Sequence, residues 1–195
     1  MKLPALFTTF LIASLCLTSR GEDLRHLLEP IPGFVGPELQ GRTREIDPDH
    51  HVYGLGFGLS REDVVRQLGA PVGYMNFTAI DEGLFFGRSH MLLFTNGKLS
   101  GVKIHPHLFD QDLSTPIPMH AFFDKADWVI APGLRQHMSF SAIAELIPQL
   151  ANRTPDFRVS YTTERSMVKL RFSSSEREGS RQYFLYGITI EPKPR

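Results

Sequence analysis

The chain has 195 residues, 42% of them hydrophobic, and it carries 21 basic and 21 acidic side chains. This composition is sufficient for a folded core. The balanced charge, without a run of Lys or Arg, argues against nucleic acid as the main partner, because that binding needs clustered cations to neutralise phosphates. The length suits one domain or two small ones.

Residues 1–20 have the layout of a secretory signal peptide. Lys2 precedes an apolar run over residues 6–17, and small polar residues follow. The run is shorter than the about 20 residues of a membrane-spanning helix, so we expect cleavage between Cys16 and Gly21 rather than a transmembrane segment. An N-terminal core helix is the alternative. Cleavage leaves 19 basic and 21 acidic residues, a net charge of −2, in a periplasmic or secreted protein.

The only cysteine, Cys16, lies at the end of the apolar run. Lipoprotein signals also end at a cysteine, but the residue before it is normally small. Here it is Leu15, which argues against a lipid anchor at Cys16. The mature chain then has no thiol, so we expect neither disulfides nor thiolate metal ligands. Its fold must depend on packing alone.

The segment 53–104 predicts one helix followed by an antiparallel meander of three or four strands. Ser60 is a good helix N-cap, Gly69 suits the helix C-terminus, and Pro71 prevents continuation. Short β-prone runs follow, separated by turn residues. Asn96-Gly97 is the strongest short hairpin signal among them, because both residues tolerate positive φ.

Three prolines make the first part of segment 105–127 the best linker candidate, since proline fits neither a central strand nor a helix interior. The order of elements then returns over 128–195, with a helix capped by Ser139 and followed by hairpins. Ser60 and Ser139 are 79 residues apart. We therefore expect an α+β fold with two tandem units, each a short helix or helix pair packed on a three- or four-stranded antiparallel sheet. An extended N-terminal arm over 21–52 precedes them.

The stretch GLSREDVVRQLGAP, residues 58–71, resembles the glycine–(Met/Leu)–(Thr/Ser)–x–x–x–Val…Leu-Gly-x-Pro signature of the SmpA/OmlA outer-membrane assembly lipoproteins. The wider group has the β-lactamase-inhibitor-protein-like fold, and two such units in tandem are similar to the secreted β-lactamase inhibitors. The second half departs from the signature, because no Leu-Gly-x-Pro follows Met138-Ser139-Phe140. The resemblance implies protein binding more than a particular reaction. The residues that carry it are Gly58, Leu59, Ser60, Val64, Leu68, Gly69, Pro71 and Asn96-Gly97-Lys98-Leu99.

The eight histidines raise a metal site as one hypothesis. His105 and His107 would share one face of an extended strand, as two imidazole ligands require, but Pro106 between them favours a surface loop. The sequence has neither a Gly-x-Ser-x-Gly nor a phosphate-binding Gly-x-x-x-x-Gly-Lys, and its paired acids lie in apparent loops. We therefore expect neither an enzyme nor a cofactor. A hydrolase or metal-binding enzyme is the alternative.

Alternation along the predicted strands of the second half indicates a mixed basic and apolar face. If the helix covers the side formed by Val168, Leu170 and Phe172, the other side presents cations between larger side chains. Such mixtures are typical of protein-binding patches, whereas an ordinary solvated sheet face is the alternative. The predicted contact residues are Arg158, Met167, Lys169, Arg171, Tyr183 and Leu185.

These features favour an exported, non-enzymatic protein-binding module that inhibits or neutralises another protein, as an inhibitor or a toxin-immunity protein does. We expect the partner to present an acidic site to the basic face. The alternative, which follows from the resemblance, is a factor for assembly or maintenance of the cell envelope. That role would need a membrane anchor.

Overall fold

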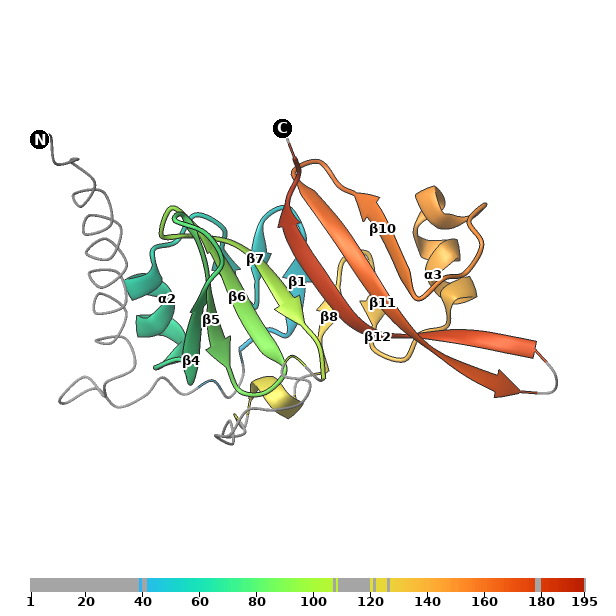
Figure 1. The fold of residues 1–195 in the computed structure, drawn as a ribbon, viewed down its shortest axis with the longest axis horizontal. Coiled ribbons are helices and arrows are strands. Elements are labelled where there is room, and N and C mark those ends of the chain that lie inside the picture. The colour runs from blue at the N-terminus through green and yellow to red at the C-terminus, as the bar shows by residue number, and fades with distance from the viewer. Residues whose placement is uncertain are drawn as a thin grey trace, which may run out of the picture.

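The computed structural model describes residues 39, 42–106, 108, 120, 122–125, 127–177 and 180–194. These residues form a mixed α+β fold with two α-helices and two sheets, which confirms the α+β part of the predicted fold (Figure 1). Within the described ranges, no helix has the length and apolar character needed to cross a bilayer. The predicted signal segment with Cys16, most of the predicted arm, His107 and much of the predicted linker lie outside the described residues.

A seven-stranded antiparallel sheet forms one layer, in the order β10-β11-β12-β7-β6-β5-β4. Strands from the two predicted units meet where β12 pairs with β7, over Ile188↔Ile104, Thr189↔Lys103 and Ile190↔Val102. The predicted separate sheets are thus one continuous sheet. Its strands are β4 (Gly73–Asn76), β5 (Asp81–Phe86), β6 (His90–Thr95), β7 (Lys98–Ile104), β10 (Arg158–Thr162), β11 (Ser166–Arg177) and β12 (Ser180–Pro192).

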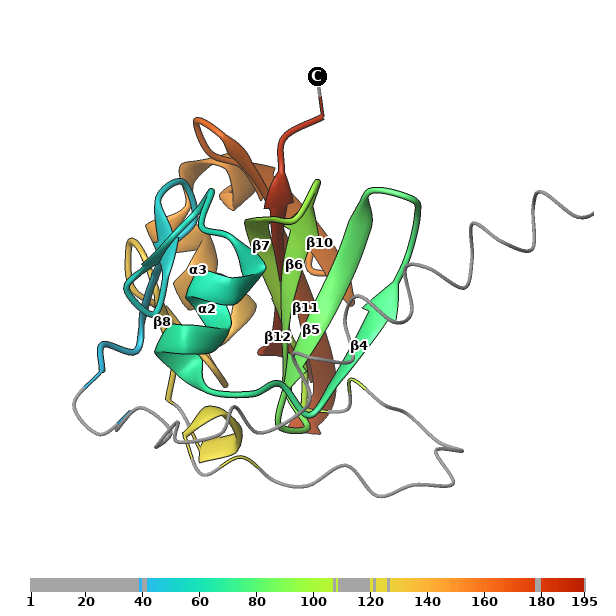
Figure 2. The same ribbon diagram turned by 90° about the vertical axis from the view of Figure 1, so that its left-hand side faces the viewer.

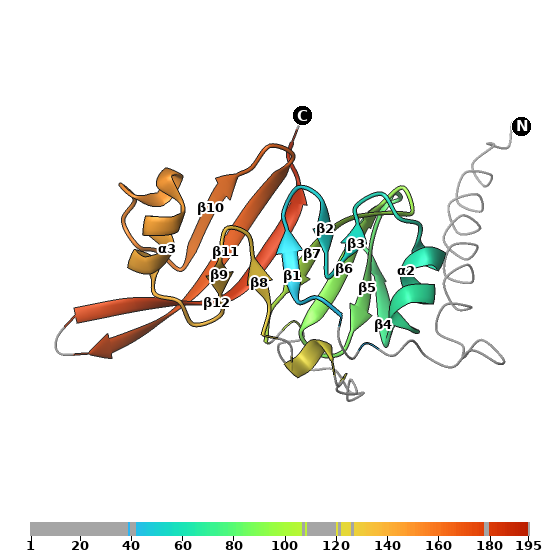
Figure 3. The same cartoon turned by 180° about the vertical axis from the view of Figure 1, so that it is seen from behind.

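The second layer consists of a smaller sheet and the two helices, α2 (Arg61–Leu68) and α3 (Phe140–Leu146). Figures 2 and 3 show all three on the same face of the large sheet. The smaller sheet has the order β3-β2-β1-β8-β9, and β1 pairs in parallel with β8 from the other half of the chain. Its strands are β1 (Glu45–Asp47), β2 (His51–Val52), β3 (Leu55–Gly56), β8 (Val129–Ile130) and β9 (Leu134–Arg135).

The hydrophobic core lies between the two layers. Helix α2 contributes one apolar stripe, as the 3.6-residue period of a helix dictates, and alternate residues of the strands face it. The smaller sheet adds Ile46, Ile130 and Leu134, all fully buried. The core residues from α2 and from the strands of the large sheet include Val64, Val65, Leu68, Leu84, Phe86, Leu92, Val102, Val168, Leu170, Phe172, Leu185, Ile188 and Ile190.

Both helices begin at the serine caps that the sequence predicts. Ser60 Oγ accepts a hydrogen bond from the Asp63 N–H, and Ser139 Oγ accepts one from the Ala142 N–H. Helix α2 ends at Gly69, whose φ of 88° lies in the region that favours glycine. Helix α3 is followed by the 3₁₀ turn η2 (Pro148–Leu150), because proline cannot continue the helix.

The segment before each helix is hydrogen-bonded to a strand of the large sheet. Ahead of α2, the Gly58 N–H donates to the Leu99 carbonyl of β7 over 2.7 Å. Ahead of α3, the His137 N–H donates to the Leu185 carbonyl of β12, also over 2.7 Å. Both donors have positive φ, 93° and 66°. The two helices are therefore attached in the same way to β7 and β12, which are neighbours in the sheet.

Two hairpins of the large sheet are irregular at corresponding places. The register shifts between Leu93 and Phe94 in the β6–β7 hairpin, and between Arg171 and Phe172 in the β11–β12 hairpin. A bulge of this kind adds one residue to a strand and reverses the direction of the side chains that follow. In β12 it brings Leu185 into the core.

Candidate functional site

The candidate site lies on the face of the seven-stranded sheet that points away from α2, α3 and the smaller sheet. We call it the open face, because no described helix or strand covers it (Figure 2). Along β11, Val168, Leu170 and Phe172 are buried, so the residues between them, Lys169 and Arg171, point to the open face.

Strand pairing places the cations of the open face in a row with apolar residues. Lys169 of β11 pairs with Thr189 of β12, and Thr189 pairs with Lys103 of β7. Lys103 pairs in turn with Met91 of β6. Neighbouring strands are about 4.8 Å apart, so only one strand spacing separates the last cation from the first apolar side chain of the row.

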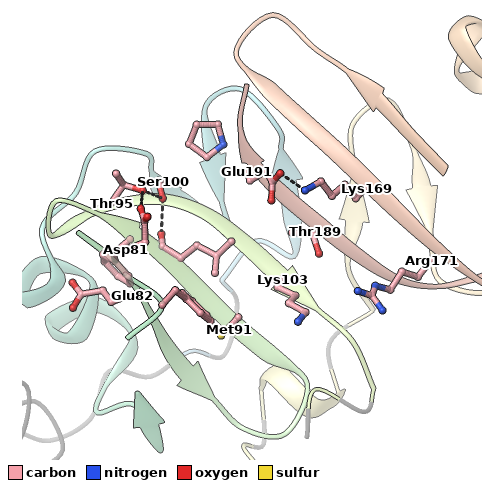
Figure 4. Close-up of a pocket in the computed structure, with 14 residues that line it drawn as sticks. Asp81, Glu82, Met91, Thr95, Ser100, Lys103, Lys169, Arg171, Thr189 and Glu191 are labelled. Carbon is pink, nitrogen blue, oxygen red and sulfur yellow. Dashed lines mark hydrogen bonds and ion pairs between the residues drawn. The ribbon is translucent and has the colours of Figure 1, made fainter. Parts of the chain in front are cut away.

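A groove of about 480 Å³ follows this row across the middle of the open face (Figure 4). One side is cationic, with Lys103, Lys169 and Arg171. The other side includes Met91 and Leu93. Its size falls within the range of small-ligand sites, and its mixed lining suits a ligand with both charged and apolar groups.

Lys103 and Arg171 form a pair of like charges at this groove. The Lys169 ammonium forms an ion pair with Glu191, whereas in the described part of the chain no carboxylate forms an ion pair with Lys103 or Arg171. Partial burial, and then the positive charge of Arg171, lower the pKa of the Lys103 ammonium. Both causes disfavour the protonated lysine, and an anion bound between the two cations would relieve the repulsion.

The acidic groups at the far end of the groove are held by neighbouring side chains. The Thr95 and Thr78 hydroxyls donate to the Asp81 carboxylate over 2.9 and 2.8 Å. Glu82 accepts a hydrogen bond from Arg61 over 3.2 Å. These contacts offset the charge of Glu82 and occupy the oxygens of Asp81. Three acids and three cations line the groove, and among the described residues the cations without a carboxylate ion-pair partner are Lys103 and Arg171.

Four of the predicted contact residues, including Lys169 and Arg171, lie on the open face. Arg158 pairs with Arg171, and Met167 pairs with Glu191, so each pair shares a face. The placement of Leu185 on this face is wrong: its side chain is 0% exposed, because the bulge reverses the alternation of β12.

The prediction that the Tyr183 side chain lies on the basic face is also wrong. It packs half-buried against the core and against the Phe157 ring, with 5.5 Å between centroids. The uninterrupted alternation assumed for β12 does not continue past the bulge. The cationic and apolar groups of the open face are therefore assembled from several strands rather than from the second half alone.

Sequence reasoning did not single out Lys103. Its neighbours Val102 and Ile104 are buried, so the alternation of β7 alone indicates that Lys103 points away from the core. Its closeness to Arg171 depends instead on the pairing of β7 with β12, which joins residues far apart in the chain. No local pattern carries that information.

The histidines considered as metal ligands have different surroundings. His105 is 8% exposed and contacts the Tyr186 ring, with 4.9 Å between centroids, and His107 lies outside the described residues. Elsewhere, His50 Nδ1 contacts the Asp47 carboxylate over 3.0 Å, and Asp47 also accepts a hydrogen bond from the Asp49 N–H. Among the residues with described positions, no three potential ligands are grouped around a common point.

A buried polar chain links the smaller sheet to the large one. The Ser89 hydroxyl donates to Asp124 over 2.8 Å, so its oxygen can accept from His90 Nδ1, also over 2.8 Å. In that tautomer His90 Nε2 accepts from the Tyr53 hydroxyl over 2.6 Å. Burial lowers the pKa of His90 to about 3. The serine proton is directed to the carboxylate rather than to the histidine, and Tyr53 is fully buried. We interpret this series of hydrogen bonds as a structural connection between the two layers.

Comparisons with known proteins give no relative for this chain. No family model, no curated protein and no solved structure matches it. The resemblance of residues 58–71 to the assembly lipoproteins therefore stays a prediction. The candidate site depends on the geometry of the open face, above all on Lys103 and Arg171.

Proposed function

We propose that this protein is an exported, non-enzymatic binding module that inhibits or neutralises another protein by docking its open face on an acidic site of that partner. The observation that carries the proposal is the pair Lys103 and Arg171, two cations that share the groove and that have no carboxylate ion-pair partner among the described residues. A partner carboxylate would supply the missing counter-charge.

The proposed architecture is two tandem helix-on-sheet units joined edge to edge through β7 and β12. It is supported by the matching hydrogen bonds from Gly58 to Leu99 and from His137 to Leu185, and by the bulges at corresponding places of two hairpins. An edge-to-edge arrangement leaves the helices on one side and produces a single long open face on the other. A surface of this kind suits a macromolecular partner better than a small substrate.

The composition of the open face matches this role. Arginine and methionine are enriched where proteins bind one another, and Arg158, Arg171 and Met167 all lie there. Complementary charge accelerates the encounter and selects among partners, and both effects weaken as salt screens the charges. Binding through this face should therefore be sensitive to ionic strength.

Charge reversal on the open face tests the proposal. The processed protein is immobilised and exposed to the envelope and secreted fractions of its source, and each captured protein is identified, produced separately and titrated by calorimetry. The Lys169→Glu/Arg171→Glu variant should lose at least about a hundredfold in affinity, because two attractive contacts become repulsive. Salt should weaken the binding of the unmodified protein.

The matched control reverses two cations on the other layer, with Arg66→Glu in α2 and Arg135→Glu in β9, both exposed. The change in net charge is the same, so affinity should stay within about twofold of the unmodified protein. Equal affinity of the Lys169→Glu/Arg171→Glu variant and the control would remove the open face from the binding mechanism.

A further inference from the structure

We infer that the groove recognises an acidic and an apolar side chain together, presented by an extended acidic segment of the partner with these two residues at positions i and i+2. The carboxylate would lie between Lys103 and Arg171, and the apolar side chain would lie over Met91 and Leu93. The inference rests on the proposed function and specifies which feature of the partner the open face binds.

The cationic end of the groove has the chemistry of a carboxylate site. Figure 4 shows Lys103 and Arg171 reaching into the groove from β7 and β11, with Thr189 of β12 between them. Arginine can bind both oxygens of a carboxylate through its planar fork, and lysine adds a compact positive charge. The positive charge of Arg171 acts on Lys103, so one anion can interact with both cations.

The apolar end is a packed surface rather than a set of mobile side chains. Met91 is 4% exposed, and its sulfur lies so close to Gly83 that a Cβ built there would be only 2.6 Å from it. Leu93 is half-buried, and Phe77 beside them is 47% exposed. An apolar side chain placed here would contact an ordered surface and would remove the Phe77 ring from water.

The distance between the two ends favours an extended segment. Met91 and Lys103 are directly paired, so their backbones are about 4.8 Å apart, and the lysine side chain extends the cationic end further. Side chains at i and i+2 of an extended peptide lie on one side, about 6.8 Å apart. Adjacent residues point to opposite sides. A pair at i and i+2 therefore reaches both ends at once.

Capped heptapeptides test this inference with the complete protein. The probe has the sequence Gly-Ser-Glu-Ser-Leu-Ser-Gly, and its comparisons replace Glu with Gln, replace Leu with Ser, or place Glu and Leu next to each other. Calorimetry and NMR titration at low salt should show the first peptide binding at least about tenfold more tightly than each of the other three. Its binding should perturb signals of Met91 and Leu93.

Two substitutions locate the effect on the protein. Lys103→Met and Arg171→Met should each lower affinity for the Glu peptide to that for the Gln peptide, while Arg135→Met on the other layer should not change it. Both positions lie outside the core, so the variants should fold, and near-ultraviolet circular dichroism verifies this. A folded Lys103→Met variant that still prefers Glu over Gln would overturn the inference.

Other results would overturn it as directly. Equal binding of the four peptides, or no binding up to about 5 mM, would show that the groove does not recognise this pair. Inorganic phosphate or decanoate that binds as tightly as the Glu peptide and displaces it would make the groove a site for free anions. If the peptides fail while a partner binds with the charge dependence described above, the inference alone fails. If that dependence is also absent, the proposed function fails with it.

Discussion

The two halves of the large sheet share a backbone design but differ in what they present on the open face. Matching positions follow from strand register: Leu92 pairs with Val102 in the first half, as Leu170 pairs with Ile188 in the second. All four are buried at 1% exposure or less. On the covered face, both halves therefore have buried aliphatic residues at matching positions, as packing of the core requires.

The open face shows the opposite behaviour. By the same register, Met91 of the first half corresponds to Lys169 of the second, and Leu93 corresponds to Arg171. One half presents apolar groups where the other presents cations. Because these positions match in register and point away from the core, packing of the core does not account for the difference. At these matched positions, the two halves differ in the side chains that they present on the open face.

The largest loss from a single substitution is expected at Gly101 of β7, which matches Gly187 of β12 in strand register. A Cβ at Gly101 would be 2.1 Å from the Ile190 carbonyl oxygen, so the backbone of the β7–β12 junction must move. At Gly187 the nearest atoms are a carbon of the His105 side chain, 2.9 Å away, and the Ile104 carbonyl oxygen, 3.1 Å away, so the backbone contact is 1.0 Å longer than at Gly101. Urea unfolding should show Gly101→Ala destabilised by about 3 kcal/mol and Gly187→Ala by about 1 kcal/mol. Equal losses of unfolding free energy in the two variants would contradict the expectation that the backbone at the β7–β12 junction resists the added Cβ more strongly at Gly101.

A second difference between the halves lies inside the core, where His90 stands at the position of Val168. Burial lowers the pKa of His90 to about 3 despite the opposing charge of Asp124. In the unfolded chain this histidine has an ordinary pKa near 6.5. Between pH 6.5 and 3 it is therefore protonated in the unfolded state and neutral in the folded state. Stability should therefore fall as pH is lowered through this window, by at most about 1.4 kcal/mol per pH unit from this group.

The double variant Tyr53→Phe/His90→Leu isolates this contribution, because it removes the histidine together with the hydroxyl that donates to it. The free energies of unfolding of the unmodified protein and of the double variant are measured at pH 7, 6, 5 and 4, and each set gives the slope of stability against pH. The variant should retain only the slope that other groups, such as His120, produce. Identical slopes would show that His90 is not held neutral.

Smaller effects than at Gly101 are expected at the two helix caps, and the smallest is expected at Ser139. Ser60→Ala should cost about 1.5 kcal/mol, because its hydroxyl also donates to the Asp63 carboxylate over 2.8 Å. Ser139→Ala should cost about 0.5 kcal/mol, since α3 has no acidic residue in its first turn. Thermal and urea unfolding measure both, with the exposed Ser174→Ala as control. A larger loss at Ser139 would contradict the comparison.

Features encoded by neighbouring residues were predictable from the sequence. The caps at Ser60 and Ser139 were found, and the Asn96-Gly97 turn has the expected positive φ at both residues, 52° and 69°. The smaller sheet was not predicted. Strands as short as His51–Val52 contain no periodicity, and the parallel pairing of β1 with β8 joins distant parts of the chain.

The candidate site was predictable to the same extent. Alternation along β11 correctly placed Lys169 and Arg171 on the face away from the core. The same rule failed for Leu185, because alternation was continued unbroken past Gly187, the residue next to the bulge of β12. Lys103 joined the site only through the pairing of β7 with β12, which is a tertiary contact.

The junction between β7 and β12 has a consequence for how the chain matures. Until the second half has folded, β7 is an unprotected sheet edge, and such edges recruit strands from other molecules. The pairing Ile188↔Ile104, Thr189↔Lys103 and Ile190↔Val102 can form equally well between two copies that exchange halves. Dilution during refolding should therefore favour the monomer, and refolding at high protein concentration should favour intertwined dimers.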